Sequence, residues 1–279
     1  LPSSSSHCAI VHVSDNELYL RYQDSRIDLA HRMPESSSAD EETPLNLDIL
    51  LGGAPKLLKD ASDEVRSGFV RKVYGILCAQ LLLTVVIAYP IWAAGTKWTV
   101  KNEWMLAVST AALVLTLLSM CCCMREMKTY PTNYMFLFAI TCAMSVVVGF
   151  ASVTYSWEYA GRTVGVTFLV FFTMSAFARY TSIDFTGAGP YFIVSLTAVM
   201  VFTFIYWYDV DAEVAWTTCH ELGVLIFACY IVYDTQLIMG LKGGHRVSFT
   251  IDDYTFAALM LYLDIVHVFT HVLSLLGER

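Results

Sequence analysis

The chain has 279 residues, of which 56% are hydrophobic and 15% are charged, and its mean hydropathy is +0.55. Soluble globular proteins carry about 25% charged residues, so the composition argues against a soluble protein and favours a surface solvated by lipid. The net charge of −8 argues against nucleic-acid binding, which favours basic surfaces. Most of the eight cysteines lie within apolar segments and none forms a CxxC pair, which favours reduced thiols over a disulfide scaffold.

The first 65 residues form a polar tail. Serine runs occupy positions 3–6 and 36–38, and an acidic run follows at 40–42. We expect residues 1–65 to be largely disordered and exposed to solvent, because they offer little apolar surface to bury. They lack a continuous apolar core behind a basic start, so we do not expect a signal peptide.

From residue 66 onward the sequence becomes a series of apolar segments. A helix needs about 20 apolar residues to cross ~30 Å of hydrocarbon. Seven segments qualify: 73–96, 104–124, 129–157, 163–178, 185–208, 214–240 and 254–277. The fourth is short, and the last two reach full length only by including Asp234 and Asp264. We therefore predict an all-α membrane protein whose residues 66–279 form a bundle of seven transmembrane helices.

The distribution of Lys and Arg predicts the orientation in the membrane. If the tail is cytosolic, that face carries Arg71, Lys72, Arg125, Lys128, Arg179, Lys242 and Arg246. The opposite face carries Lys97, Lys101, Arg162 and Arg279, and its loop after the fifth span carries the acidic residues Asp209, Asp211 and Glu213. Because cytosolic loops carry the excess of basic residues, we predict a cytosolic N-terminus.

Asp234 and Asp264 are the first candidates for function. A charged side chain in the bilayer costs roughly 2.5 to 3.5 kcal/mol on insertion scales, and building a bundle does not require one. Asp234 lies six residues before the end of its segment and Asp264 ten residues after the start of the next, which places them ~9 and ~15 Å from the same face. We expect the two carboxyls to lie close together.

Two carboxylates that meet in a low dielectric cannot both ionise easily, so such a pair shares one proton. With that proton, Asp234 and Asp264 would be a latch between two helices. Without it, the dianion would repel itself open or bind a hard cation such as Ca²⁺. The alternative is a structural hydrogen bond between helices.

Three further groups could join this site. Arg125, at the end of the second span, could pair with a carboxylate, or it could extend its side chain to the membrane surface. Asp264, His267 and His271 are spaced i, i+3, i+7, so they share one helical face and could form a metal site or a proton relay. More often such histidines face a polar crevice.

Two other clusters could be functional sites or could have only an ordinary structural role. His220 and Glu221 begin the sixth span, and with the acidic loop before it they could form a funnel that concentrates cations; a solvated loop explains the loop residues equally well. Cys121, Cys122 and Cys123 could be palmitoylated, or they could be small apolar residues at a helix end.

The same region carries a family resemblance. Tyr233-Asp234-Thr235-Gln236, Asp252-Asp253-Tyr254, Leu261-Tyr262-Leu263-Asp264-Ile265 and Leu276-Gly277-Glu278-Arg279 resemble the Bax-inhibitor/lifeguard transmembrane family. Asp184-Phe185-Thr186-Gly187 and Arg71-Lys72-Val73-Tyr74 are similar to its lifeguard and Golgi anti-apoptotic branch. The resemblance covers about residues 65–279.

The resemblance implies a seven-helix bundle with a central C-terminal helix between two groups of three. It implies a Ca²⁺ leak channel of the endoplasmic reticulum or Golgi membrane that restrains cell death, with Ca²⁺ and protons as ligands and cell-death regulatory proteins as partners. It also implies that Asp234 and Asp264 form a pH-sensitive pair that holds the ion, with Arg125 as a partner. No cofactor is expected, and His267 and His271 belong to no family motif.

Two other functions compete with a channel. An intramembrane aspartyl protease also places Tyr-Asp in one helix and Asp in the next, but the bulky Leu261-Tyr262-Leu263 would crowd a substrate strand, so we do not expect an enzyme. A non-conducting protein could instead suppress cell death by binding partners through its tail or helices.

Overall fold

The computed structural model describes residues 57–122, 129–208, 213–240 and 249–277. The tail was predicted to be largely disordered over residues 1–65, and its residues 1–56 lie outside the described part, where this stays a prediction. The part that follows is ordered, since a short 3₁₀ helix η1 (Leu58–Asp60) precedes a long helix that begins at Asp63. Ser62 caps this helix by accepting a hydrogen bond from the Val65 N–H, as N-cap serines do.

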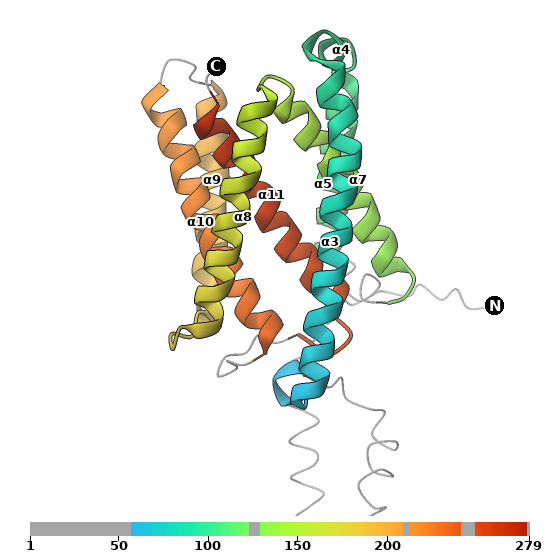
Figure 1. Ribbon diagram of the computed structural model, residues 1–279, viewed down its shortest axis with the longest axis vertical. Coiled ribbons are helices and arrows are strands. Elements are labelled where there is room, and N and C mark those ends of the chain that lie inside the picture. Colours follow the sequence, from blue (N-terminus) through green and yellow to red (C-terminus); the bar gives the residue numbers. More distant parts are fainter. Residues whose placement is uncertain (1–56, 123–128, 209–212, 241–248, 278–279) are drawn as a thin grey trace, which may run out of the picture. The chain divides into compact units, whose positions relative to one another are not determined.

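Seven long helices occupy the described residues, one for each predicted apolar segment (Figure 1). They are α3 (Asp63–Ala94), α5 (Glu103–Cys122), α7 (Thr132–Ser152), α8 (Trp157–Tyr180), α9 (Gly189–Tyr208), α10 (Glu213–Met239) and α11 (Tyr254–Leu276). A short helix, α4 (Thr96–Lys101), follows α3, and a 3₁₀ turn, η2 (Thr186–Ala188), precedes α9.

Within the described ranges, five helices are long and apolar enough to cross a membrane. They are α3, α7, α8, residues Thr217–Met239 of α10, and α11. The stretch Glu103–Thr116 of α5 is apolar but shorter. These helices make the chain a multi-pass membrane protein, whereas the count of seven spans stays a prediction.

The predicted fourth span, residues 163–178, lies within a longer helix that qualifies as a span. Helix α8 begins at Trp157, directly after the extended N-cap Ser156, and has 24 residues. Glu158 suits its first turn, because the helix dipole favours a negative charge there. Arg162 lies over the ring of Tyr159, which gives its charge a favourable contact within the helix.

Helix α11 lies between two groups of helices. On one side α3 and α5 pack against α7, and on the other α8 and α9 pack against α10. Helix α11 contacts α3, α7, α8 and α10, and it runs obliquely between the two groups in Figure 1. It therefore takes the central position that the resemblance implies for the last helix.

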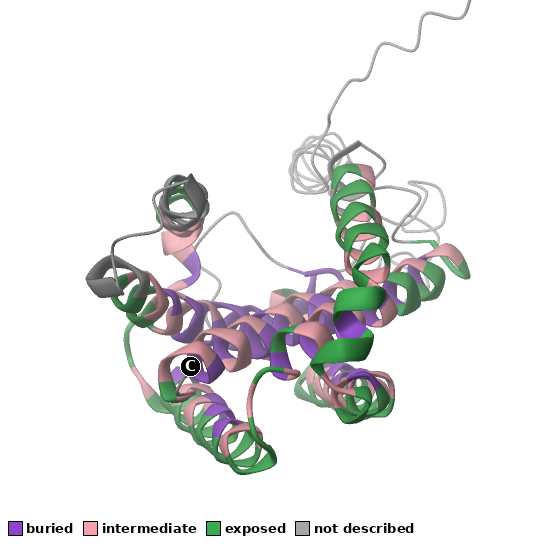
Figure 2. Ribbon diagram, turned by 90° about the horizontal axis from the view of Figure 1, so that it is seen from above, coloured by how far each residue is buried: buried purple, intermediate pink, exposed green. Residues whose placement is uncertain are grey.

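The burial pattern is that of a protein in lipid. Buried residues lie on the inner helices, while the outer faces of the peripheral helices are exposed (Figure 2). Many of the exposed side chains are large and apolar, among them Leu82, Val86, Phe138, Phe168, Leu169 and Ile193. An apolar exterior of this kind requires a hydrocarbon environment.

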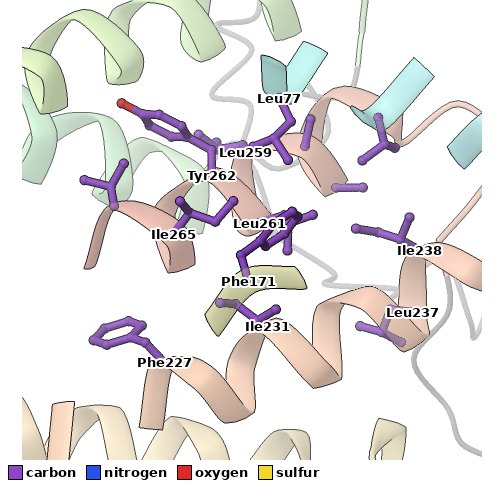
Figure 3. Packing of buried hydrophobic residues seen from close by; sticks show 14 of the residues in the cluster. Leu77, Phe171, Phe227, Ile231, Leu237, Ile238, Leu259, Leu261, Tyr262 and Ile265 are labelled. Atoms are coloured by element: carbon purple, nitrogen blue, oxygen red, sulfur yellow. The ribbon is translucent and has the colours of Figure 1, made fainter. Parts of the chain in front are cut away.

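The core combines apolar packing with buried hydrogen bonds between helices. Figure 3 shows Leu261 and Ile265 of α11 in one cluster with Phe171 of α8 and Ile231 of α10. On the opposite side of α11, the Tyr262 hydroxyl lies 2.8 Å from the Thr84 hydroxyl of α3. Polar contacts of this kind hold membrane helices together, because lipid offers no hydrogen-bond partners.

Helices α3 and α7 approach each other closely at Gly149. A Cβ atom at this position would lie 3.0 Å from the Ile91 Cβ and 3.2 Å from the Ala88 Cα. Small residues permit such close crossings between membrane helices.

We expect Gly149→Ala to lower the free energy of unfolding by about 1–3 kcal/mol, because α3 must move away from α7. The matched control is Gly165→Ala on α8, where a Cβ would meet nothing within 4 Å. The control should be neutral or stabilising by up to about 1 kcal/mol, since alanine favours a helix. Thermal unfolding of the purified variants in detergent measures both, and equal shifts would contradict the close-crossing argument.

Candidate functional site

The structure brings Asp234 and Asp264 together. Helices α10 and α11 pack against each other, and the carboxyl groups of Asp234 and Asp264 lie close enough to interact directly. Asp234 is 1% exposed and Asp264 is 5% exposed, so water reaches neither carboxyl. The expected proximity of the two aspartates is therefore observed at the centre of the bundle.

A hydrogen bond between the two carboxyls needs a hydrogen that the pair itself must carry. In the described part of the chain, Asp234 Oδ1 and Asp264 Oδ2 receive no donor from any other group. Two ionised carboxylates have only acceptor atoms, so they cannot bond to each other. A single proton held between the two carboxyls would supply the hydrogen for a bond between α10 and α11.

A neighbouring tyrosine does not substitute for this proton. Tyr230 lies one turn before Asp234 on α10 and close to both aspartates. Its hydroxyl donates instead to the Phe192 carbonyl of α9, at 2.6 Å. Tyr230 therefore anchors α10 to α9 and leaves the carboxyl pair to itself.

The residues that flank Asp234 each contact a different neighbour. Tyr233 packs against Phe192 of α9, with ring centroids 5.4 Å apart. Thr235 faces a cavity between α3 and α8. Gln236 binds the segment between α8 and α9: its Oε1 accepts from the Phe185 N–H at 2.8 Å, and its Nε2 donates to the Ile183 and Ala178 carbonyls at 3.0 and 3.3 Å.

Sequence reasoning did not identify Gln236 as a structural residue. The motif that contains it served only to indicate a family. A buried amide inside an apolar segment was the available signal, because such a group must find hydrogen bonds.

The two histidines of α11 do not join Asp264 in a metal cluster. His267 Nδ1 lies 2.6 Å from the carbonyl of Leu263 on its own helix, and its ring stacks on Phe227 at 4.5 Å. His271 pairs with His220 of α10, with 2.9 Å between their Nδ1 atoms. Across the described ranges, no three His, Cys, Asp or Glu side chains come together as metal ligands.

Helical spacing alone did not indicate His220 as the neighbour of His271. Residues at i, i+3 and i+7 share a face, but the ring of His271 turns toward α10, where Gly223 leaves room for it. A Cβ at Gly223 would lie 2.5 Å from the His271 ring.

The structure describes the remaining candidate residues only in part. Arg125 and Cys123 lie outside the described residues, as do Asp209 and Asp211. The side chains of Cys121, Cys122 and Glu213 also fall outside the description. Glu221 is exposed near the start of α10. The proposed contact of Arg125 with the pair, the acidic funnel and the palmitoylation site stay predictions.

Comparison with known proteins gives one family. The family model described as inhibitor of apoptosis-promoting Bax1 matches residues 66–279. Protein lifeguard 3 of Homo sapiens is 31% identical over 228 residues, which cover 77% of this chain and 70% of the relative. The Mus musculus protein of the same name is also 31% identical, over 71% of its length. Bax inhibitor 1 of Schizosaccharomyces pombe is 28% identical over 220 residues, 78% of this chain and 79% of the relative.

We expect Gln236→Leu to loosen the segment between α8 and α9, because the Phe185 N–H and the Ile183 carbonyl lose their partner. One hydrogen bond contributes about 1 kcal/mol, so amide exchange at Phe185 should become roughly fivefold faster. Hydrogen–deuterium exchange mass spectrometry of peptides spanning 181–188 measures this.

The control is Gln80→Leu, which removes a buried amide that donates to the Thr141 hydroxyl at 3.0 Å on the other side of the bundle. It should leave exchange in 181–188 unchanged. If both variants accelerate exchange there equally, the effect is general destabilisation, and the assignment of Gln236 to this segment is wrong.

Proposed function

Because the chain belongs to the family of inhibitors of apoptosis-promoting Bax1, we propose that it is a pH-sensitive Ca²⁺ leak channel of an intracellular membrane that restrains apoptosis. The membrane-spanning helices and the family support a membrane protein in the control of cell death. The observation that carries the channel proposal is the buried pair of Asp234 and Asp264, in which one oxygen of each carboxyl finds no donor in the described part of the chain.

The pair would act as gate and proton sensor together. With one shared proton it joins α10 to α11. When the proton leaves, two negative charges remain in a low dielectric, and their repulsion is relieved by separation of the helices or by a cation. A carboxylate pair suits Ca²⁺, a hard ion that binds oxygen; because Ca²⁺ takes 6–8 oxygens, water or other oxygens would complete its shell.

The position of the pair lets a local change reach the whole bundle. Asp264 lies on α11, which contacts helices of both groups. A shift of α10 relative to α11 would therefore change the packing between the two groups. Arg125 would stabilise the closed form by pairing with a carboxylate.

The proposal also fixes a location and an orientation. The protein would reside in the Golgi or endoplasmic reticulum membrane with its N-terminus in the cytosol, and ions would move passively from the lumen to the cytosol. The excess of Lys and Arg on one face supports this orientation.

A second candidate is a non-conducting protein that inhibits apoptosis by binding other proteins. The printed name of the matched family, an inhibitor of apoptosis-promoting Bax1, favours it. Absence of Ca²⁺ flux in liposomes, together with loss of cell protection on deletion of residues 1–56, would support this candidate over the channel. Cleavage of a membrane-anchored reporter that Asp264→Ala abolishes would instead support a protease.

The channel proposal makes a prediction about pH. Purified protein in Ca²⁺-loaded liposomes should leak Ca²⁺ at a rate that changes with pH. Asp234→Asn and Asp264→Asn should each abolish the change, because an amide donates to the remaining carboxylate without a titrating proton. The measurement is dye-reported Ca²⁺ flux across a pH series.

Asp252→Asn is the matched control, because Asp252 is exposed before α11. It should leave the pH response intact. A wild-type response that persists in both buried-site variants would refute the gate assignment, and an absence of flux at every pH would refute the channel.

A further inference from the structure

A cavity outside the aspartate pair lies at one end of the bundle. It has a volume of about 580 Å³ and lies between α3, α8 and α10. Helix α3 begins there at Asp63, whereas α8 ends there at Tyr180 and α10 at Met239. Sites for small molecules occupy roughly 300–1,000 Å³, so the cavity is large enough to hold one.

The mouth of the cavity carries two arginines. Arg66 of α3 is only 21% exposed at its side chain, and its ion-pair partner Asp63 is 92% exposed and faces water. Arg179 of α8 makes no ion pair with any described residue; its Nη1 lies 3.9 Å from the Met239 sulfur, which is a weak acceptor. The two positive charges of Arg66 and Arg179 thus exceed the single negative charge of Asp63 among the residues that line the cavity.

The floor of the cavity offers buried hydroxyls. The Ser175 and Thr235 hydroxyl oxygens are buried, and the Tyr74 hydroxyl lies close enough to both to interact with them. Each of the three hydroxyls has one donor and two acceptor sites, so Tyr74 alone cannot satisfy both neighbours, and a ligand or water can bind there.

One wall of the cavity is open to lipid. Phe172 lines the cavity and is also 51% exposed on the outer face of α8. Val70 and Met239 add further apolar surface. A ligand in this cavity can therefore place an anionic group on the arginines while an attached apolar part lies along Phe172 toward the bilayer.

We propose that the cavity bounded by Arg66, Arg179 and Thr235 binds the phosphate of an anionic phospholipid. Guanidinium groups recognise phosphate through paired, charge-assisted hydrogen bonds. Two arginines and a floor of hydroxyls provide donors for a phosphate, and the opening beside Phe172 favours a lipid over a free anion. The bound lipid would join α3 to α8 and contact α10 at the residue after Asp234. This proposal does not rest on Ca²⁺ conduction.

The test is binding of a defined lipid to the purified full chain. Native mass spectrometry in detergent would titrate dioleoyl phosphatidic acid against dioleoyl phosphatidylcholine, with inorganic phosphate as a third ligand. We expect phosphatidic acid to bind at least tenfold more tightly than phosphatidylcholine. Arg66→Gln and Arg179→Gln should each weaken this binding roughly tenfold, because each removes a charge-assisted contact.

Two further variants separate binding from folding. Arg162→Gln is the matched control, because Arg162 lies on α8 near its other end, and it should bind phosphatidic acid like the wild type. Asp63→Asn should bind severalfold more tightly, because it releases Arg66 from its ion pair. Arg66→Lys keeps the charge and should retain most of the binding if the glutamine variant fails to fold.

Several outcomes would overturn the proposal. They are equal binding of the two lipids, equal effects of the Arg162 and Arg179 substitutions, or weaker binding by Asp63→Asn. Inorganic phosphate that binds as tightly as the lipid, with the same dependence on both arginines, would show a soluble anion site and overturn the lipid assignment.

Discussion

Lipid offers no hydrogen bonds, so each polar group inside this bundle must find its partner within the chain. The structure satisfies this constraint in two ways on opposite sides of α11. Toward α3, the Tyr262 and Thr84 hydroxyls pair in a contact that is complete without any change of protonation. Toward α10, the carboxyl groups of Asp234 and Asp264 have only acceptor atoms unless one of them holds a proton. The two sides of the central helix therefore satisfy their polar groups in different ways.

The same constraint relates the carboxyl pair to the cavity beside it. Thr235 directly follows Asp234, and its hydroxyl lies on the cavity floor beside the Tyr74 hydroxyl. Adjacent residues of α10 thus face two polar regions, one that needs a proton and one that has room for a ligand. The exposed apolar faces of α8 and α9 supply the lipid contact that makes both regions costly to leave unsatisfied.

Hydropathy and helical rise were enough to predict the long helices and the similar depth of Asp234 and Asp264, because both depend on distances along single helices. The fourth span was predicted too short, since α8 begins at Trp157, before the predicted start at residue 163. The pairing of His271 with His220 and the bonds of Gln236 could not be predicted, because they depend on how neighbouring helices are rotated. Periodicity specifies a helical face but not the element opposite it.

Tyr233, Asp234, Thr235 and Gln236 follow one another on α10, and successive residues point about 100° apart around a helix. Their contacts therefore surround α10, with α9, α11, the cavity beside α3 and α8, and the segment before α9 in turn. A helix that is held by contacts on all sides cannot rotate about its axis in small steps, since any rotation breaks all four contacts together. We therefore expect this part of α10 to move between discrete conformations and not gradually.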